Sequence, residues 1–108
     1  MASSETRSYP RKVVRCSAMI AVPGSAVMRG RTIDVSLGGL SLTMADQLPT
    51  GLQCDVAFDP LFNGAPHRII AKAKVVYCIL SGKEGFRIGL QFVSLDAENN
   101  KLLAQLMI

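Results

Sequence analysis

The sequence is poor in the residues from which catalytic, metal and disulfide sites are built. It contains one histidine and three cysteines, and none of the motifs HExxH, GxSxG, GK(S/T) or CxxC. His67 follows a proline at a loop–strand junction, which predicts a surface position. Cys16, Cys54 and Cys78 are widely spaced in apolar segments, which predicts free, buried thiols in a reducing cytoplasm. We therefore expect a binding protein with no catalytic residues, no metal and no cofactor.

Long apolar runs are also missing. No stretch approaches the ~18 apolar residues that a membrane span requires, and the N-terminus (MASSETRSYPRK) lacks the apolar core of a signal peptide. These absences predict a cytoplasmic protein without membrane insertion. The 108 residues, 49% of them hydrophobic, fit one globular domain. We expect a flexible arm at residues 1–10 and a single domain at residues 11–108.

Positive charge is concentrated near the N-terminus, and aromatic residues are few. Residues 1–31 hold six basic residues and one acidic residue, whereas residues 32–108 hold six basic and seven acidic residues. This asymmetry predicts an anionic partner. Small barrels that bind single-stranded nucleic acid display aromatic side chains for base stacking. Here aromatics make up 6% of the chain, and Phe58, Phe86 and Phe92 fall on apolar strand faces. Nucleic acid is therefore the less favoured partner.

Apolar and polar residues alternate along six short segments separated by turns, which is the period of β-strands. The segments are residues 14–22, 26–35, 40–44, 52–58, 69–79 and 86–92. Residues 95–107 then change to helical spacing, with Ser94 as the expected N-cap. The pattern predicts an all-β fold: a six-stranded antiparallel β-barrel with a C-terminal α-helix.

Polar side chains cluster at the turn between the second and third of these strands. If Ile33 and Val35 face the core, Asp34 and Ser36 stand side by side outside the barrel. Gly38-Gly39 permits positive φ and close approach of a ring or phosphate to the backbone. This carboxylate and hydroxyl can bind a polar ligand, or they can simply cap amides of the turn.

Two arginines four residues apart, Arg11 and Arg15, precede the first strand. In an extended chain they share a face at ~13 Å, and in a helix they share a face as well. A guanidinium group matches phosphate oxygens or the edge of guanine in bidentate fashion. The spacing alone also describes two solvated arginines.

In combination, the two motifs resemble the PilZ domain family. The resemblance rests on RKVVR (11–15), on DVSLGG (34–39) about twenty residues later, on RIGLQF (87–92) in the last strand, and on the closing helix. It covers nearly everything from Arg11 to the C-terminus. It implies a receptor for the bacterial second messenger cyclic di-GMP.

Site residues follow from the resemblance motif by motif. It implies that the two arginines grip phosphates and guanine, and that the turn holds a guanine from the barrel side. The implied ligand contacts are Arg11, Arg15, Asp34, Ser36 and Gly39, with Gly38 adjacent. Many family members carry an arginine directly before RxxxR that holds a stacked ligand pair, but this chain has Pro10, which favours a single ligand. Tyr77 is similar to an aromatic contact that some members offer from the barrel wall; it is equally well a core residue.

The resemblance also implies how the receptor signals. We expect residues 1–15 to fold over the barrel when ligand binds, so that the changed surface acts in trans on an unidentified protein partner. A monomer or a weak homodimer is expected. The two alternatives are a nucleic-acid-binding small β-barrel and a PilZ-like interaction domain that binds no nucleotide.

Overall fold

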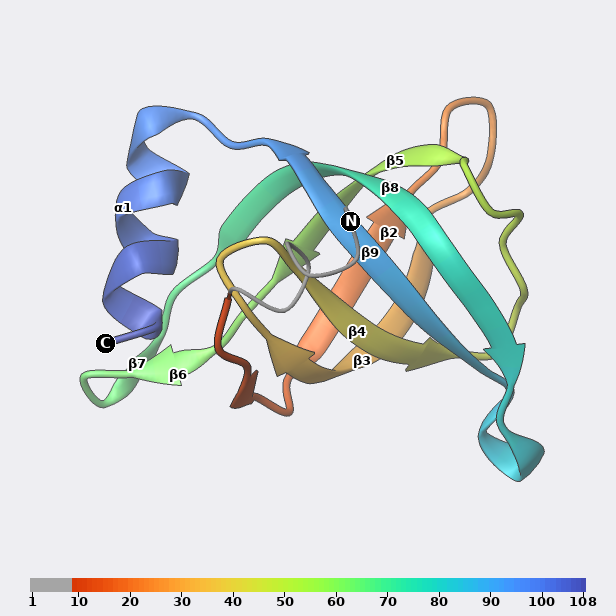
Figure 1. Ribbon diagram of the computed structural model, residues 1–108, viewed down its shortest axis with the longest axis horizontal. Coiled ribbons are helices and arrows are strands. Elements are labelled where there is room, and N and C mark those ends of the chain that lie inside the picture. The colour runs from red at the N-terminus through yellow and green to blue at the C-terminus, as the bar shows by residue number, and fades with distance from the viewer. Residues whose placement is uncertain (1–8) are drawn as a thin grey trace.

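A computed structural model describes residues 9–108 and shows a closed antiparallel barrel with one helix packed beside it (Figure 1). Six strands form the barrel in the order β3-β2-β5-β8-β9-β4, and a β3–β4 pairing closes it. The strands are β2 (Ser17–Ala21), β3 (Met28–Val35), β4 (Gly39–Met44), β5 (Gln53–Phe58), β8 (Ile69–Leu80) and β9 (Phe86–Ser94). Helix α1 spans Ala97–Leu106. The predicted six-stranded barrel with a C-terminal helix is confirmed.

Alternating apolar residues fill the barrel interior, as the sequence pattern predicts. Phe58 is fully buried, and its ring stacks on Phe92 with centroids 6.4 Å apart. Cys16 and Cys54 are buried free thiols, whereas Cys78 is free but only partly buried, so the prediction of a buried thiol is wrong for Cys78. Burial raises the pKa of the Cys54 thiol. No helix within residues 9–108 is long and apolar enough to cross a membrane.

Short elements occupy the remaining connections. β6 (Leu61–Phe62) and β7 (Ala65–Pro66) form a small hairpin across the positive-φ pair Asn63-Gly64. The His67 ring packs against Phe62 with centroids 4.4 Å apart. A 3₁₀ turn at Gly82–Glu84 joins β8 to β9.

Two strand irregularities move side chains away from their predicted faces. A register shift in β3 between Thr32 and Asp34 turns Thr32 inward, where it is 1% exposed, and leaves Ile33 only partly buried. The prediction that Ile33 faces the core is therefore wrong. A similar shift in β8 between Val75 and Tyr77 makes Ile79 55% exposed rather than buried. An extra residue in one strand reverses the alternation beyond it.

Helix α1 begins later than the sequence predicts. β9 continues to Ser94, and the N-cap is Asp96, whose side chain accepts a 2.8 Å hydrogen bond from the Asn99 amide. The prediction of Ser94 as N-cap is wrong because Ser94 still pairs with Lys72 of β8. Leu103 and Leu106 bury the inner face of the helix against the barrel.

The Asp96 cap predicts a pH dependence of stability. Hydrogen bonds from the Asn99 backbone and then its side chain lower the pKa of Asp96 below 3.8. Because the folded-state pKa is depressed, the contribution is present above pH ~3.8 and is lost as the pH falls through the lowered pKa. Urea unfolding across this acid range should show a smaller loss for Asp96→Asn than for the unmodified chain, since asparagine caps without titrating. Parallel acid profiles would contradict this role.

Candidate functional site

The RxxxR segment lies along the barrel rather than apart from it. β1 (Lys12–Val13) pairs with Val35 and Asp34 of β3, on the edge of β3 that β2 occupies further along. Residues 11–15, which were expected to fold over the barrel only when ligand binds, therefore already lie against it without ligand. Residues 1–8, most of the predicted arm, lie outside the described residues.

A buried threonine fixes the bend between β1 and β2. The Thr32 hydroxyl donates to the Val14 carbonyl and accepts from the Cys16 amide at 3.0 Å. The Thr32 amide donates in turn to the Cys16 carbonyl at 2.9 Å. These bonds satisfy the backbone groups that the bend removes from the sheet. Sequence reasoning missed Thr32 because its inward orientation depends on the register shift of β3.

Arg11 and Asp34, one from each motif, contact each other directly. Arg11 Nη1 donates to Asp34 Oδ1 at 2.9 Å, and Ser41 Oγ donates to the same oxygen at 2.8 Å. The side chain of Arg11 is 55% exposed and that of Asp34 is 18% exposed. An exposed pair of this kind contributes ~0–1 kcal/mol. A ligand with stronger acceptors for Arg11 can therefore break the Arg11–Asp34 ion pair at little cost in free energy.

Ser36 does not stand beside Asp34 on the outer surface. It is 5% exposed, its hydroxyl donates to the Gly39 carbonyl at 3.3 Å, and it accepts from the Gly38 amide at 3.1 Å. The prediction of side-by-side exposure is wrong because β3 ends at Val35 and the chain turns inward at once. In this structure Ser36 caps the turn, which was the alternative interpretation of the motif.

The two glycines of the turn meet different neighbours, so a side chain is disfavoured at each position for a different structural reason. Neither Gly38 nor Gly39 has a positive φ, contrary to the expectation from the sequence. A Cβ at Gly39 would overlap the Leu90 carbonyl oxygen, so glycine there allows β4 to approach β9. A Cβ at Gly38 would lie 2.8 Å from the ring of Tyr9, which is 46% exposed. Gly39 thus permits close packing of two barrel strands, and Gly38 permits the Tyr9 ring to lie against the turn at the surface.

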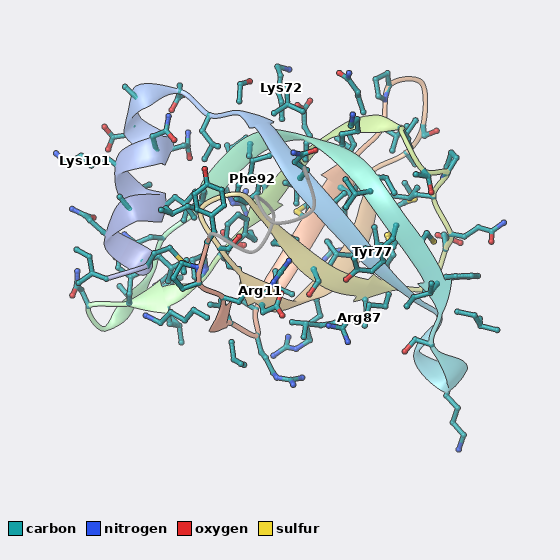
Figure 2. All side chains as sticks on the ribbon, in the orientation of Figure 1. Arg11, Lys72, Tyr77, Arg87, Phe92 and Lys101 are labelled. Carbon is teal, nitrogen blue, oxygen red and sulfur yellow. The ribbon has the colours of Figure 1, made fainter. Side chains whose placement is uncertain are left out.

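Tyr77 lies outside the barrel on the same row of residues as Asp34. Across β3, β4, β9 and β8 the register aligns Asp34, Ser41, Gly89 and Tyr77. A Cβ at Gly89 would overlap the Tyr77 ring, so the ring lies over this glycine (Figure 2). The interpretation of Tyr77 as a core residue is wrong. Its contact with a ligand stays a prediction.

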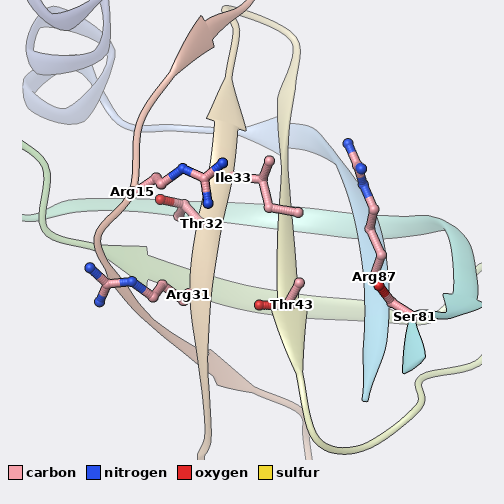
Figure 3. A pocket seen from close by; sticks show the side chains of 7 residues that line it. All are labelled: Arg15, Arg31, Thr32, Ile33, Thr43, Ser81 and Arg87. Atoms are coloured by element: carbon pink, nitrogen blue, oxygen red, sulfur yellow. The ribbon is translucent and has the colours of Figure 1, made fainter. Parts of the chain in front are cut away.

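Arg15 lines a separate cavity of about 350 Å³ next to this row (Figure 3). The lining residues are Arg15, Arg31, Thr32, Ile33, Thr43, Ser81 and Arg87. The two motif arginines therefore reach different parts of the surface, Arg11 the carboxylate and Arg15 the cavity. Sequence reasoning missed Arg31 and Arg87 because they become neighbours only through the pairing of β3, β4 and β9.

Lys12 connects the motif segment to the helix. Its ammonium group donates to the Leu106 carbonyl of α1 at 2.9 Å. A cation at the C-terminal end of a helix is electrostatically favourable, because the carbonyl groups there carry partial negative charge. Movement of residues 11–15 therefore requires this contact with α1 to break or shift.

Comparison with known proteins places this fold and these motifs in context. The PilZ domain family model matches residues 5–108. Among solved structures, the Bacillus subtilis inhibitor of motility MotI (DgrA) aligns with a TM-score of 0.80 and 18% identity, covering 94% of this chain and 49% of that one. The chain therefore spans about half the length of MotI.

Two isolated PilZ domains also align. The PilZ domain of Escherichia coli YcgR, solved with c-di-GMP, gives a TM-score of 0.66 at 15% identity, covering 94% of this chain and 88% of that one. The PilZ domain of CeSA from a cellulose-synthesizing bacterium gives 0.62 at 19% identity, with coverage of 91% and 94%. No curated protein matches. At these identities the solved structures establish the shared fold.

Proposed function

Because the chain belongs to the PilZ domain family, we propose that it is a receptor for cyclic di-GMP. The observation that carries the proposal is the 2.9 Å contact between Arg11 and Asp34, which joins the two family motifs on one surface. The E. coli YcgR domain, whose fold this chain shares, was solved with that ligand, which supports the choice.

The chemistry of this surface matches a ligand with two phosphodiesters and two guanines. Arg11 and Arg15 supply donors that fit phosphate oxygens. Asp34, once Arg11 turns to the phosphate, can accept from the N–H groups of a guanine edge. Tyr77 offers a half-buried ring on the same row for stacking. The turn residues Ser36, Gly38 and Gly39 keep this edge of the barrel in shape and bring its backbone close to the ligand.

The receptor signals through a change in residues 11–15. Arg11 exchanges its contact with Asp34 for the phosphate, which displaces β1 from its position on β3. Since Lys12 lies in β1 and holds the Leu106 carbonyl, the displacement reaches the C-terminal end of α1. The altered surface over β1 and α1 is then recognised in trans by a protein partner in the cytoplasm. This chain acts as an effector and not as an enzyme.

Amide hydrogen exchange tests this signalling step. Displacement of β1 from β3 should change the hydrogen-exchange protection of peptides from residues 1–15, because the amides that pair with β3 exchange their partners. Peptides covering β5, which β2 separates from β3, are the internal control and should not change. Unchanged protection of residues 1–15 at saturating cyclic di-GMP would rule out the proposed movement.

Calorimetric titration with cyclic di-GMP tests the function itself. We expect saturable heat with one ligand per chain, and weaker binding of single-stranded oligonucleotides of mixed sequence. Phe58 is buried and stacked on Phe92, so neither ring provides an exposed stacking platform for bases. Tighter binding of the oligonucleotides would favour the nucleic-acid alternative. Absence of heat from correctly folded protein would favour a PilZ-like domain that binds no nucleotide.

A further inference from the structure

The cavity beside the motif surface is lined by three arginines and no described acidic residue. Arg31 of β3 and Arg87 of β9 are both paired with Thr43 of the intervening strand β4. Neighbouring strands lie ~4.8 Å apart, which places the two arginine Cα atoms roughly 10 Å from each other. Both guanidinium groups can therefore reach an anion held over the Thr43 hydroxyl. Figure 3 shows Arg31 and Arg87 on opposite sides of Thr43, with Arg15 above Arg31.

No described acidic side chain pairs with an arginine of this cavity. No acidic side chain is among the described residues that line it. Among the side chains that the structure describes within residues 9–108, which do not include Glu84, the ion pairs join Arg11 to Asp34, Arg68 to Asp59 and Lys72 to Asp55. None of them involves a cavity arginine. Three arginines line one cavity of about 350 Å³, and a bound anion would offset their positive charge.

The motif residues alone do not balance the charge of the proposed ligand. Arg11, Arg15 and Asp34 together carry a formal charge of +1, because the carboxylate cancels one arginine. A cyclic dinucleotide with two phosphodiesters carries a charge of −2. Adding Arg31 and Arg87 raises the formal charge of the binding residues to +3, which is enough to neutralise both phosphodiesters.

We propose that Arg31 and Arg87, together with Arg15, bind the second phosphodiester of the same cyclic di-GMP molecule whose first phosphodiester is bound by Arg11. This assignment rests on the proposed function. Asp34 and Arg31 are three residues apart on β3, roughly 10 Å along the strand, so one ligand can lie across both. In the structure Arg31 extends away from β9 (Figure 3), and ligand binding draws it over Thr43.

Glutamine variants of the two cavity arginines test the assignment by calorimetry. Arg31→Gln and Arg87→Gln should each weaken cyclic di-GMP binding by roughly 10- to 100-fold, the usual worth of a hydrogen bond to a charged group. The affinity of Arg31→Lys should lie between those of Arg31→Gln and the unmodified chain, because lysine retains the positive charge but lacks the planar, bidentate guanidinium group. Arg29→Gln is the matched control, since Arg29 lies exposed on the same strand outside the cavity. It should bind within about twofold of the unmodified chain.

The outcomes separate this assignment from the receptor proposal. If the unmodified chain binds and Arg11→Ala does not, but both glutamine variants bind normally, the cavity assignment is overturned and the receptor proposal stands. If the unmodified chain binds two ligands and the variants bind one, the cavity holds a second molecule, which also overturns it. No binding by the folded, unmodified chain overturns both. Thermal melts of each variant show whether it is folded, and the exposed Arg31 should leave them unchanged.

Discussion

Replacing Arg11 or Arg15 by alanine is expected to weaken cyclic di-GMP binding by at least about 100-fold, with almost no change in the melting temperature. A bidentate guanidinium–phosphate contact has two charge-assisted hydrogen bonds, each worth ~1.5–3 kcal/mol, and tenfold in affinity corresponds to about 1.4 kcal/mol. Folding depends little on either side chain, because both are exposed and the ion pair of Arg11 is a surface pair.

The control for this experiment is Arg68→Ala. Arg68 is also 55% exposed and forms two hydrogen bonds to Asp59, at 2.9 and 3.1 Å, and neither residue belongs to the two motifs. This variant makes the same change in net charge, so it separates local contacts from long-range attraction of an anionic ligand. Calorimetric affinity and thermal melts are measured for all three variants. Equal affinity of Arg11→Ala and Arg68→Ala for cyclic di-GMP would show that Arg11 does not contact the ligand.

Gly39→Ala is expected to have the largest effect on folding. The added methyl group overlaps the Leu90 carbonyl oxygen, which belongs to the backbone and cannot rotate aside. Relief requires β4 and β9 to separate where Gly39 pairs with Gln91. Overpacking typically lowers the free energy of unfolding by ~1–3 kcal/mol where side chains can move aside. We expect a loss at or above the upper end of this range, because the overlapping atom belongs to the backbone.

Gly38→Ala is the matched comparison. Its methyl group meets the ring of Tyr9, which is half exposed and free to swing outward, so the cost should stay below about 1 kcal/mol. Urea unfolding of both variants gives the two free energies, and loss of soluble Gly39→Ala protein is the extreme of the expected result. Equal stability of the two variants would show that the close approach of β4 to β9 is not a constraint.

The barrel could be predicted from sequence because its strands alternate with few interruptions. Ala18 and Ile20 of β2 and Val56 and Phe58 of β5 are buried as their period-two pattern predicts. The errors in strand facing, at Ile33 and Ile79, accompany the register shifts in β3 and β8, where one extra residue interrupts the alternation. Such shifts depend on how neighbouring strands pair, which alternation within a single strand does not encode.

The candidate site was predictable only in its motif residues. The spacing of charged residues led to Arg11 and Asp34, which the structure joins directly. Ser36 is predicted on the outer surface but is buried, and its hydroxyl bonds within the turn. Sequence alone does not show whether a hydroxyl beside a turn bonds to the turn or to a ligand. Arg31 and Arg87 are 56 positions apart in sequence and become neighbours only through the pairing of three strands.

Titration of ¹⁵N-labelled protein with cyclic di-GMP, followed by NMR through backbone amides and arginine Nε–H groups, tests the central claim most directly. We expect saturable shifts in β1, in the turn at residues 34–41 and at Tyr77, together with the Nε–H signals of Arg11 and Arg15. Signals from β6, β7 and the hairpin they form should stay in place. Absence of shifts at saturating ligand, or shifts confined to surfaces away from β1 and the turn, would contradict the account.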